Sequence, residues 1–295
     1  MTDQDRPKTA QIPKAKFHPY PWYAPRFWHG MRAGTWLKML ASHRFSVHPF
    51  RVPMAFAISN FSLFNSIFYR LEQSIHGKAI ASTAVEKPVV FIIGHWRSGT
   101  TLLHELLDLD TQFRSPTTYE CFVPHHFLLT QSAITKIFWY TLPSKRPMDN
   151  MATGWKRPQE DEFALMNMGL PSTYLRTGYP NDTEQYLDYL NLENLSTERR
   201  NEWKEGLDRF IKTLTYTSKK QILLKSPPHT GRVAILRELY PNAKFIHITR
   251  SPYSVVPSTI RLWQSLNGVQ GLQLDKNTIE AQQKYVFDCY HQMYP

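Results

Sequence analysis

Cysteine is scarce in this 295-residue chain. Its only cysteines are Cys121 and Cys289. No C-x-x-C pair and no Cys/His spacing accompanies them, which excludes the common zinc-binding patterns. We expect two reduced thiols, as is usual in a cytosolic protein, rather than one disulfide.

Long apolar runs are absent as well. No stretch of about eighteen uncharged apolar residues occurs, so the sequence predicts no transmembrane helix. The first residues, MTDQDRPKTAQIPKAK, lack the apolar segment of a signal peptide. Because they are polar and contain proline, we expect residues 1–16 to form a disordered tail. These features favour a cytoplasmic protein. No internal repeat or low-complexity segment is present.

Acidic residues are outnumbered by basic ones, with 24 Asp and Glu against 35 Lys and Arg, for a net charge of +11. Such an excess is typical of proteins that bind nucleic acid, an anionic membrane surface or an anionic substrate, and an ordinary basic surface is a further alternative. Charge alone does not choose among them. The apolar fraction of 42% and the length fit one large globular domain with additions.

The stretch from Pro88 to Leu109, PVVFIIGHWRSGTTLLHELLDL, organises the chain. Its apolar start, 89–93, is typical of a strand buried on both faces of a parallel sheet. Gly94 ends the strand, and leucines at helical spacing follow from Leu102. The turn between strand and helix offers free N–H groups, hydroxyls and the guanidinium of Arg97. The segment therefore predicts a site for a phosphate or sulfate group.

This turn differs from the phosphate loop of ATP-hydrolysing enzymes. Gly94 and Gly99 have the G-x-x-x-x-G separation, but Thr100 stands where that loop has its lysine. The lysine bridges the β- and γ-phosphates in nucleotide hydrolysis, so its loss argues against that chemistry. The turn taken alone is also compatible with a simple strand–helix connection that needs glycines.

A second block lies far along the chain, at 223–263: LLKSPPHTGRVAILRELYPNAKFIHITRSPYSVVPSTIRLW. We expect strands at 221–225 and 244–249, ending in Lys225 and Arg250. In an open α/β sheet, side chains at the carboxyl ends of strands point into the crevice where ligands bind. Arginine suits a phosphate because its planar fork donates two hydrogen bonds at once.

Together, GHWRSGTTLL at 94–103 and this second block resemble the sulfotransferase family that uses 3′-phosphoadenylyl sulfate (PAPS) as donor. The resemblance covers about 86–265 and is closest to the bacterial branch akin to the tyrosylprotein type. It implies an α/β fold: a P-loop-like parallel sheet flanked by helices, here with an N-terminal helical arm and a helical insertion. It implies transfer of a sulfuryl group to a hydroxyl, with PAPS as co-substrate and no metal.

The resemblance also assigns roles to residues. Those expected to hold the 5′-phosphosulfate are Arg97, Ser98, Gly99, Thr100 and Thr101, and those expected to hold the 3′-phosphate are Arg250 and Ser258. Lys225 and Arg97 would stabilise the charge that develops on the transferred group. Glu120 stands at the position of the family's catalytic base, and His229 is a second candidate because its ordinary pKa lies near neutrality. Either could instead serve only at a helix start.

The acidic trio in RPQEDEFAL at 157–165 has no partner ligands at metal spacing, so a helix-start or acceptor-pocket role is favoured for Glu160, Asp161 and Glu162. We divide the chain into a tail and helical arm at 1–85 and an α/β domain at 86–295, with a helical acceptor-side insertion at 130–220. Further elements are expected at the following ranges: helices at 54–71, 98–109, 132–141, 160–168, 183–190, 197–217, 232–240 and 277–293, a strand or extended segment at 113–119, and a helix from about 123.

The arm at 17–50 is rich in aromatic and basic residues. It fits either a membrane-surface segment or, as we favour, an arm packed on the main domain. The helix at 54–71 carries an apolar stripe expected to pack in the core, with a wall of the acceptor pocket as a second role: Met54, Ala57, Ile58, Phe61, Phe64, Phe68 and Leu71.

The acceptor is open: a small molecule, a carbohydrate, a lipid or a peptide hydroxyl, with no nucleic acid as partner. The alternatives to a sulfotransferase are a P-loop kinase or NTPase, or an inactive nucleotide-binding or membrane-peripheral protein. Family members continue beyond the position matching Pro295 with a further strand-bearing segment and nucleotide-contacting loop. We therefore expect this chain to lack that part, which bears on whether it is active.

Overall fold

The structure, a computed structural model, describes residues 18–183 and 185–294; the predicted tail at 1–16 lies outside them. Four parallel strands form one sheet in the order β2–β3–β1–β4: β1 Val90–Ile93, β2 Phe113–Arg114, β3 Gln221–Lys225 and β4 Lys244–His247. All four residues of β1 are buried, because the strand lies between two neighbours and under helices. The predicted parallel sheet with flanking helices is confirmed.

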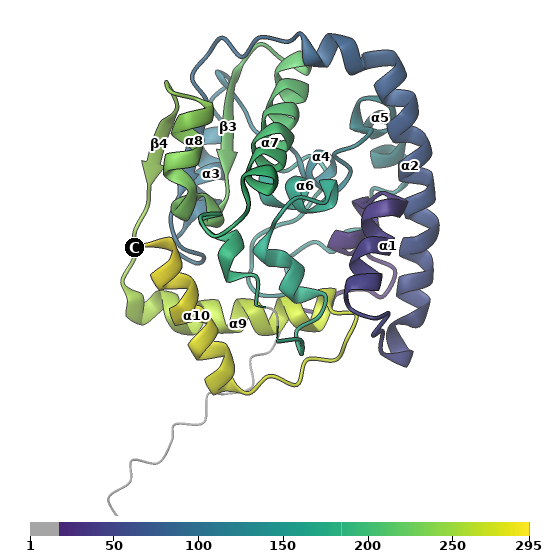
Figure 1. The fold of residues 1–295 in the computed structure, drawn as a ribbon, viewed down its shortest axis with the longest axis vertical. Helices are drawn as coiled ribbons and strands as arrows, with labels where there is room; N and C mark the ends of the chain where they lie inside the picture. Colours follow the sequence, from purple (N-terminus) through teal and green to yellow (C-terminus); the bar gives the residue numbers. More distant parts are fainter. Residues whose placement is uncertain (1–17, 184, 295) are drawn as a thin grey trace, which may run out of the picture.

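The strands continue into helices that cover the sheet. They are α3 Thr100–Asp108 after β1, α8 Val233–Leu239 between β3 and β4, and α9 Pro252–Gln270 and α10 Ile279–Met293 after β4. A 3₁₀ turn, Pro227–Arg232, joins β3 to α8. Figure 1 shows α8 beside the strands, α9 and α10 below them, and α2 at the opposite edge of the molecule. The carboxyl ends of β1, β3 and β4 thus meet at one edge, as a parallel sheet requires.

The insertion between β2 and β3 is helical. It holds α4 Thr118–Phe122, α5 Phe127–Ile137, α6 Asp161–Met168, the 3₁₀ turns Thr173–Thr177 and Leu187–Tyr189, and α7 Thr197–Thr217. The bounds of β3 and α7 match the prediction. The two helices expected from about 123 and at 132–141 are instead the single helix α5, and α9 was not predicted. Three further elements differ. The extended segment expected at 113–119 is a strand of two residues, a short helix already contains Glu120, and the helix expected at 183–190 is one 3₁₀ turn.

The N-terminal arm packs on the rest of the chain. It comprises the 3₁₀ turns Phe27–Gly30 and Pro49–Arg51, α1 Ala33–Ser42 and α2 Val52–Ala81. Trp28 and Trp36 are fully buried, and Trp28 Nε1 donates to the backbone oxygen of Gln270 at 2.7 Å. One core cluster contains side chains of the arm, the insertion and the sheet, and so crosses the predicted boundary at residue 85. The packed-arm interpretation is confirmed for this part of the arm.

Helix α2 departs from the prediction in length and in orientation. It runs on through the segment expected to connect it to the first strand, ending only at Ala81. Of the stripe expected in the core, Ile58 is fully buried in the core cluster and Met54 packs against that cluster, whereas Phe61, Phe64 and Leu71 are exposed. The expectation was wrong for these three side chains, because hydrogen bonds of polar side chains also hold the inward face of α2. No residue of α2 lines the cavity at the donor turn described below.

Cys121 and Cys289 are separate, buried thiols. Among the residues that the structure describes, none of the helices combines the length and the apolar character needed to cross a bilayer.

Candidate active site

The turn after β1 depends on two glycines with positive φ, 141° at Gly94 and 109° at Gly99. A Cβ on Gly94 would lie 2.3 Å from the backbone oxygen of Ile248, so no other residue fits there without moving β4's continuation. The Gly94 N–H donates to Thr230 Oγ1 at 2.8 Å, which ties the turn to the segment after β3. The first N–H groups of α3 have no partner within their helix and are directed to the site.

Arg97 joins the two sequence blocks. Its backbone has a φ of 69°, unusual for a residue with a side chain. Its Nε donates to Ser258 Oγ at 2.9 Å, across 161 positions of sequence. Arg250 in turn donates from Nη1 to the backbone oxygen of Arg97 at 3.4 Å. The residues predicted for the 5′-phosphosulfate and for the 3′-phosphate therefore lie in contact.

A cavity of about 440 Å³ opens at this place. Five predicted donor-site residues line it: Arg97, Gly99, Thr100, Thr101 and Arg250. Much of the remaining wall is apolar and comes from the arm, the insertion and α9, with these side chains: Phe27, Phe122, Leu142, Met148, Met151, Phe163, Leu262, Leu266 and Val269. One region is thus cationic and rich in N–H groups, and the rest suits an apolar molecule.

Ser98 does not line this cavity. It is buried, and its Oγ donates to the backbone oxygen of His95 at 2.7 Å. Its side chain shapes the turn, as expected of a short hydroxyl that competes for backbone groups.

The carboxylate of Asp149 forms an ion pair with the guanidinium of Arg97. One of its carboxylate oxygens lies 2.6 Å from Arg97 Nη1 and also accepts a hydrogen bond from Arg146. Burial raises the pKa of Asp149, but hydrogen bonds from Arg146 and Arg97 outweigh it, and the net pKa is lowered. Asp149 is therefore an anion, and any anionic ligand of Arg97 must compete with it.

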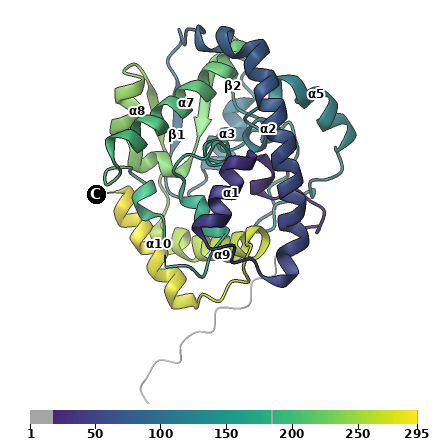
Figure 2. The ribbon, with the colours of Figure 1, turned by 45° about the vertical axis from the view of Figure 1, so that its right-hand side comes forward.

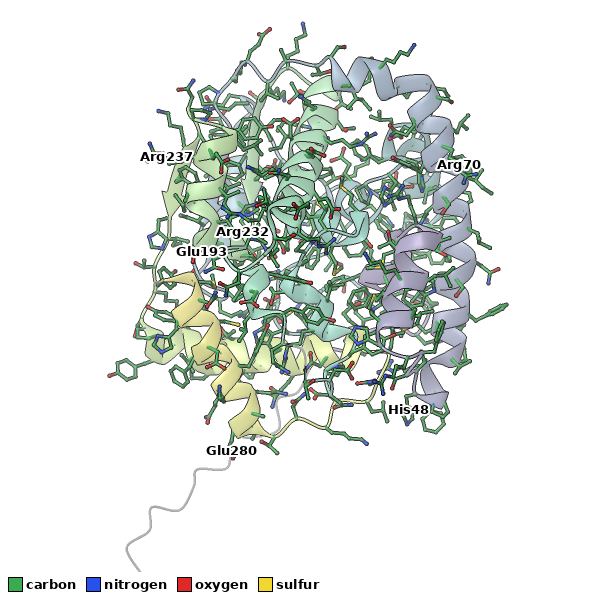
Figure 3. All side chains as sticks on the ribbon, viewed as in Figure 1. His48, Arg70, Glu193, Arg232, Arg237 and Glu280 are labelled. Atoms are coloured by element: carbon green, nitrogen blue, oxygen red, sulfur yellow. The ribbon has the colours of Figure 1, made fainter. Side chains whose placement is uncertain are left out.

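The acidic trio at the start of α6 forms three consecutive ion pairs with the segment at the end of β3. Lys225 Nζ lies 2.6 Å from Glu160, His229 Nε2 lies 2.7 Å from Asp161, and Arg232 Nη1 lies 2.6 Å from Glu162. In the second and third pairs both side chains are fully buried, and Figure 3 labels Arg232 in the interior of the molecule.

Burial and pairing act in opposite directions on the pKa values of two of these groups, Lys225 and Asp161. Burial lowers the pKa of Lys225 while Glu160 raises it, leaving a net lowering. Burial raises the pKa of Asp161, but His229 and the hydrogen bonds outweigh it, and the net pKa is lowered. Arg232 donates two hydrogen bonds to Glu162, the geometry in which a guanidinium best fits a carboxylate.

Glu160 is the carboxylate of this trio that borders the cavity. Its second oxygen accepts from the Tyr174 hydroxyl at 2.7 Å, and that hydroxyl accepts from Trp96 Nε1 at 2.8 Å. Burial, followed by the charge of Glu160, raises the pKa of Tyr174 well above its usual value, so Tyr174 remains a donor. Through Tyr174, Glu160 is thus linked to Trp96, the residue that precedes Arg97.

The two groups predicted as bases, the Glu120 carboxylate and the His229 imidazole, do not line the cavity. Glu120 forms an ion pair with Arg114 and accepts from the Thr117 N–H at 2.7 Å, completing a capping box. Its neighbour Thr118 lines the cavity, and residues two apart on a helix point in nearly opposite directions. His229 is fully buried and bound to Asp161. Glu120, His229, Lys225 and Ser258 are all outside the cavity lining.

Sequence reasoning missed the contributions of Asp149, Arg146 and Tyr174 to this site. Nothing in their spacing marks them, because they come from irregular segments of the insertion. A usable signal did exist for Glu160: three successive acids at one helix start and three basic residues, 225, 229 and 232, after one strand. Buried charges need partners, so two such groups of opposite sign are candidates for pairing.

A family model described as "Sulfotransferase family" matches residues 88–295 of the chain. Two curated relatives are named omega-hydroxy-beta-dihydromenaquinone-9 sulfotransferase Stf3, one from Mycobacterium bovis and one from Mycobacterium tuberculosis. Each is 42% identical over 252 residues, which are 85% of this chain and 64% of the relative. The chain therefore spans less than two thirds of the length of these relatives.

Two solved structures share the fold at lower identity. Sulfotransferase STF1 from Mycobacterium tuberculosis has a TM-score of 0.57 at 16% identity, covering 88% of this chain and 70% of that one. Sulfotransferase STF9 from Mycobacterium avium has a TM-score of 0.53 at 20% identity, covering 81% and 68%. With the family model matching more than half of its length, this chain belongs to the sulfotransferase family.

Proposed function

We propose that the protein transfers a sulfuryl group from PAPS to the hydroxyl of an apolar acceptor. The observation that carries the proposal is the contact of Arg97 with Ser258 and Arg250 at the cationic side of the cavity. Thr100, Thr101 and the first N–H groups of α3 would hold the 5′-phosphosulfate. Arg250 and Ser258 would hold the 3′-phosphate, and the donor would displace Asp149 from Arg97.

The acceptor side of the proposal rests on the apolar cavity wall. A hydroxyl on a largely apolar molecule would place its apolar part against the side chains that the arm, the insertion and α9 contribute to the wall. The curated relatives are named for omega-hydroxy-beta-dihydromenaquinone-9, a hydroxylated lipid. We propose a lipid alcohol as the acceptor class of this chain.

The proposed reaction is an in-line displacement at sulfur. The acceptor oxygen bonds to sulfur, the bond from sulfur to the bridging oxygen breaks, and adenosine 3′,5′-bisphosphate leaves. The acceptor proton passes to a base, and among the carboxylates we favour Glu160, which borders the cavity beside the donor turn. Glu120 and His229 would need the chain to rearrange before they could reach the acceptor.

Arg97 and Lys225 are the proposed electrostatic partners of the transition state. Arg97 reaches the cavity directly, and Lys225 lies 2.6 Å from Glu160. Their charges would offset the negative charge that builds up on the bridging oxygen, as cations do in phosphoryl transfer. The scheme uses no metal ion.

A hydroxylated lipid resides in or passes through a membrane, so the proposal includes a cytoplasmic protein that visits the membrane surface. Of the arm that the sequence marked for this role, Trp22 and Tyr23 are exposed, while Trp28 and Trp36 are buried.

The first test is calorimetric titration of the protein with adenosine 3′,5′-bisphosphate beside ATP. We expect the bisphosphate to bind and ATP to bind more weakly. Arg97→Ala should weaken bisphosphate binding at least about tenfold, because it removes a charge-assisted contact. Arg237→Ala removes the same charge from an exposed position on α8 and should leave binding nearly unchanged.

Turnover is then measured with labelled PAPS and a long-chain primary alcohol in detergent micelles. Transfer of the label to the alcohol is the expected result. ATP binding equal to or tighter than that of the bisphosphate would instead favour a kinase-like enzyme. Bisphosphate binding without transfer to any alcohol, phenol or sugar tested would favour a nucleotide-binding protein without this activity.

A further inference from the structure

Helix α2 turns its apolar side away from the protein. The side chains of Phe56, Leu63 and Ile67 are 71%, 59% and 65% exposed, and Leu71 and Ile75 continue the row. Steps of seven, four, four and four residues keep these side chains on one side of an α-helix. Single exposed apolar residues are ordinary, but a row along a 30-residue helix is not.

The opposite side of α2 is buried, and between the apolar side chains of Ile58 and Ile80 it is polar. Asn65 Nδ2 donates to the backbone oxygens of His29 and Met31 at 2.7 and 2.9 Å. Glu72 accepts from the Leu129 N–H at 3.3 Å, and Ser62 is buried as well. These contacts leave the helix no freedom to rotate its apolar side inward, so the exposed row is the orientation that the packing requires.

The charged side chains that α2 itself places on this row are cations, while Glu202 and Glu205 of α7 line a groove together with Arg70. Between residues 18 and 81 the only acidic residue is Glu72, which is buried. Arg70 lies seven residues after Leu63 and three after Ile67, and Lys78 has the same relation to Leu71 and Ile75. Both cations therefore share the apolar side. Figure 3 shows Arg70 on the outer edge of α2.

We infer that the outward side of α2 docks on an anionic lipid surface. Apolar side chains enter the boundary between headgroups and acyl chains, and the long side chains of Arg70 and Lys78 reach the headgroup phosphates. A second copy of the chain fits less well, because it would bring Arg70 and Lys78 of the two copies together.

The surface continues towards the cavity. In both Figure 1 and Figure 2, α5 lies beside α2. The residues at its end, Ile137, Phe138, Trp139 and Tyr140, are exposed, and Leu142 lines the cavity. Docking does not depend on the proposed reaction; only the idea that the membrane delivers the acceptor to this cavity rests on it.

The test is co-sedimentation of the full chain with phosphatidylcholine vesicles, with and without phosphatidylglycerol. We expect binding to vesicles that contain phosphatidylglycerol, and loss of that binding at high salt. Leu63→Ser with Ile67→Ser should weaken it at least about tenfold, because two apolar side chains no longer enter the lipid. Arg70→Gln with Lys78→Gln should remove most of the preference for phosphatidylglycerol.

The matched control is Leu109→Ser with Phe287→Ser, which removes side chains 78% and 50% exposed from α3's end and α10. It should bind vesicles as the unchanged protein does. All three double variants should keep bisphosphate binding and unfold at the same temperature as the unchanged protein, which separates loss of docking from loss of folding or of the donor site.

Absence of vesicle binding, or binding that the Leu63→Ser, Ile67→Ser variant retains, would overturn the inference. Sedimentation that shows a dimer broken by the same variant, without vesicle binding, would assign the surface to a second copy instead.

Discussion

Glu160 and Glu120 are both buried carboxylates paired with a cation, yet they are connected differently. Glu160 borders the cavity and contacts Lys225 and Tyr174, whereas Glu120 closes a capping box and pairs with Arg114. At the scale of single residues, this difference is the reason that we propose Glu160 rather than Glu120 as the base.

Glu160→Gln tests that difference. It should lower the rate of sulfuryl transfer about 10²- to 10⁴-fold, because an amide cannot take the acceptor proton. Bisphosphate affinity measured by calorimetry should remain, since the donor contacts are elsewhere. Glu120→Gln is the matched control: it should keep the rate and lose about 1 kcal/mol of stability with its cap. The opposite pattern would assign the base to Glu120.

Gly94→Ala tests the donor turn. Its φ of 141° and the 2.3 Å approach of a Cβ to the oxygen of Ile248 leave no room for a side chain. We expect a loss of at least about 2 kcal/mol in denaturant unfolding, with loss of bisphosphate binding. Gly268→Ala, in α9, meets nothing within 4 Å and should be neutral or stabilising. Equal effects of the two substitutions would contradict this account of the turn.

At the scale of elements, α6 is fastened to the end of β3 by the three ion pairs. Glu162→Gln should cost about 3 kcal/mol in denaturant unfolding, because it leaves the buried charge of Arg232 without its partner. Adding Arg232→Met should recover part of that loss. A double variant that loses the full sum of both single effects would mean that the two side chains do not act as a pair.

Elements with strong local signals were predictable from the sequence. Strand β3 and helix α7 have the predicted bounds, and the donor turn follows from Gly94, Arg97 and Gly99. Helix α2 was predicted as a helix, but its orientation was not, because periodicity identifies two faces without saying which one the protein covers. Here hydrogen bonds of Asn65 and Ser66 decided it.

The site was predictable where motifs carry it and not where irregular segments do. The resemblance of the two blocks assigned Arg97, Arg250 and Ser258 to one donor site. The structure has these residues in contact, and their binding of the donor stays a prediction. The role of Asp149 depends on how a loop of the insertion folds over Arg97, and no local pattern encodes that. Whether Thr118 or Glu120 faces the cavity depends on where α4 begins, to within two residues. Helix boundaries predicted from sequence are not that precise.

For the whole molecule, buried histidines dominate the response to acid. Burial lowers the pKa of His104 and His125 to about 3 and that of His29 and His126 to about 4, and it also lowers the pKa of His95. Burial raises the pKa of Glu72 to about 7, with the opposite effect. The histidines contribute stability that is complete above their unfolded pKa of 6.5 and is lost as the pH falls towards 4.

The net effect follows from proton counting. Near pH 5 the unfolded chain binds about four protons on His29, His104, His125 and His126 that the native protein does not, and the native protein holds about one extra on Glu72. The free energy of unfolding should therefore fall by roughly 3 to 4 kcal/mol per pH unit as the pH drops from about 6 to about 5. Denaturant unfolding across this range is the measurement.

His125→Gln should make that slope shallower, whereas His291→Gln, which changes an exposed histidine of α10, should leave it unchanged. A free energy of unfolding that does not change with pH would contradict the assignment.

The three ion pairs also bear on how the chain can vary and be recombined. Residues 160–162 lie in the insertion and residues 225–232 follow a sheet strand, yet each acid requires its own cation. Among relatives, substitutions in one segment should therefore be accompanied by substitutions in the other. An insertion exchanged between two members to alter acceptor choice would carry its acids into a new setting, and the exchange should succeed only when Lys225, His229 and Arg232 travel with it.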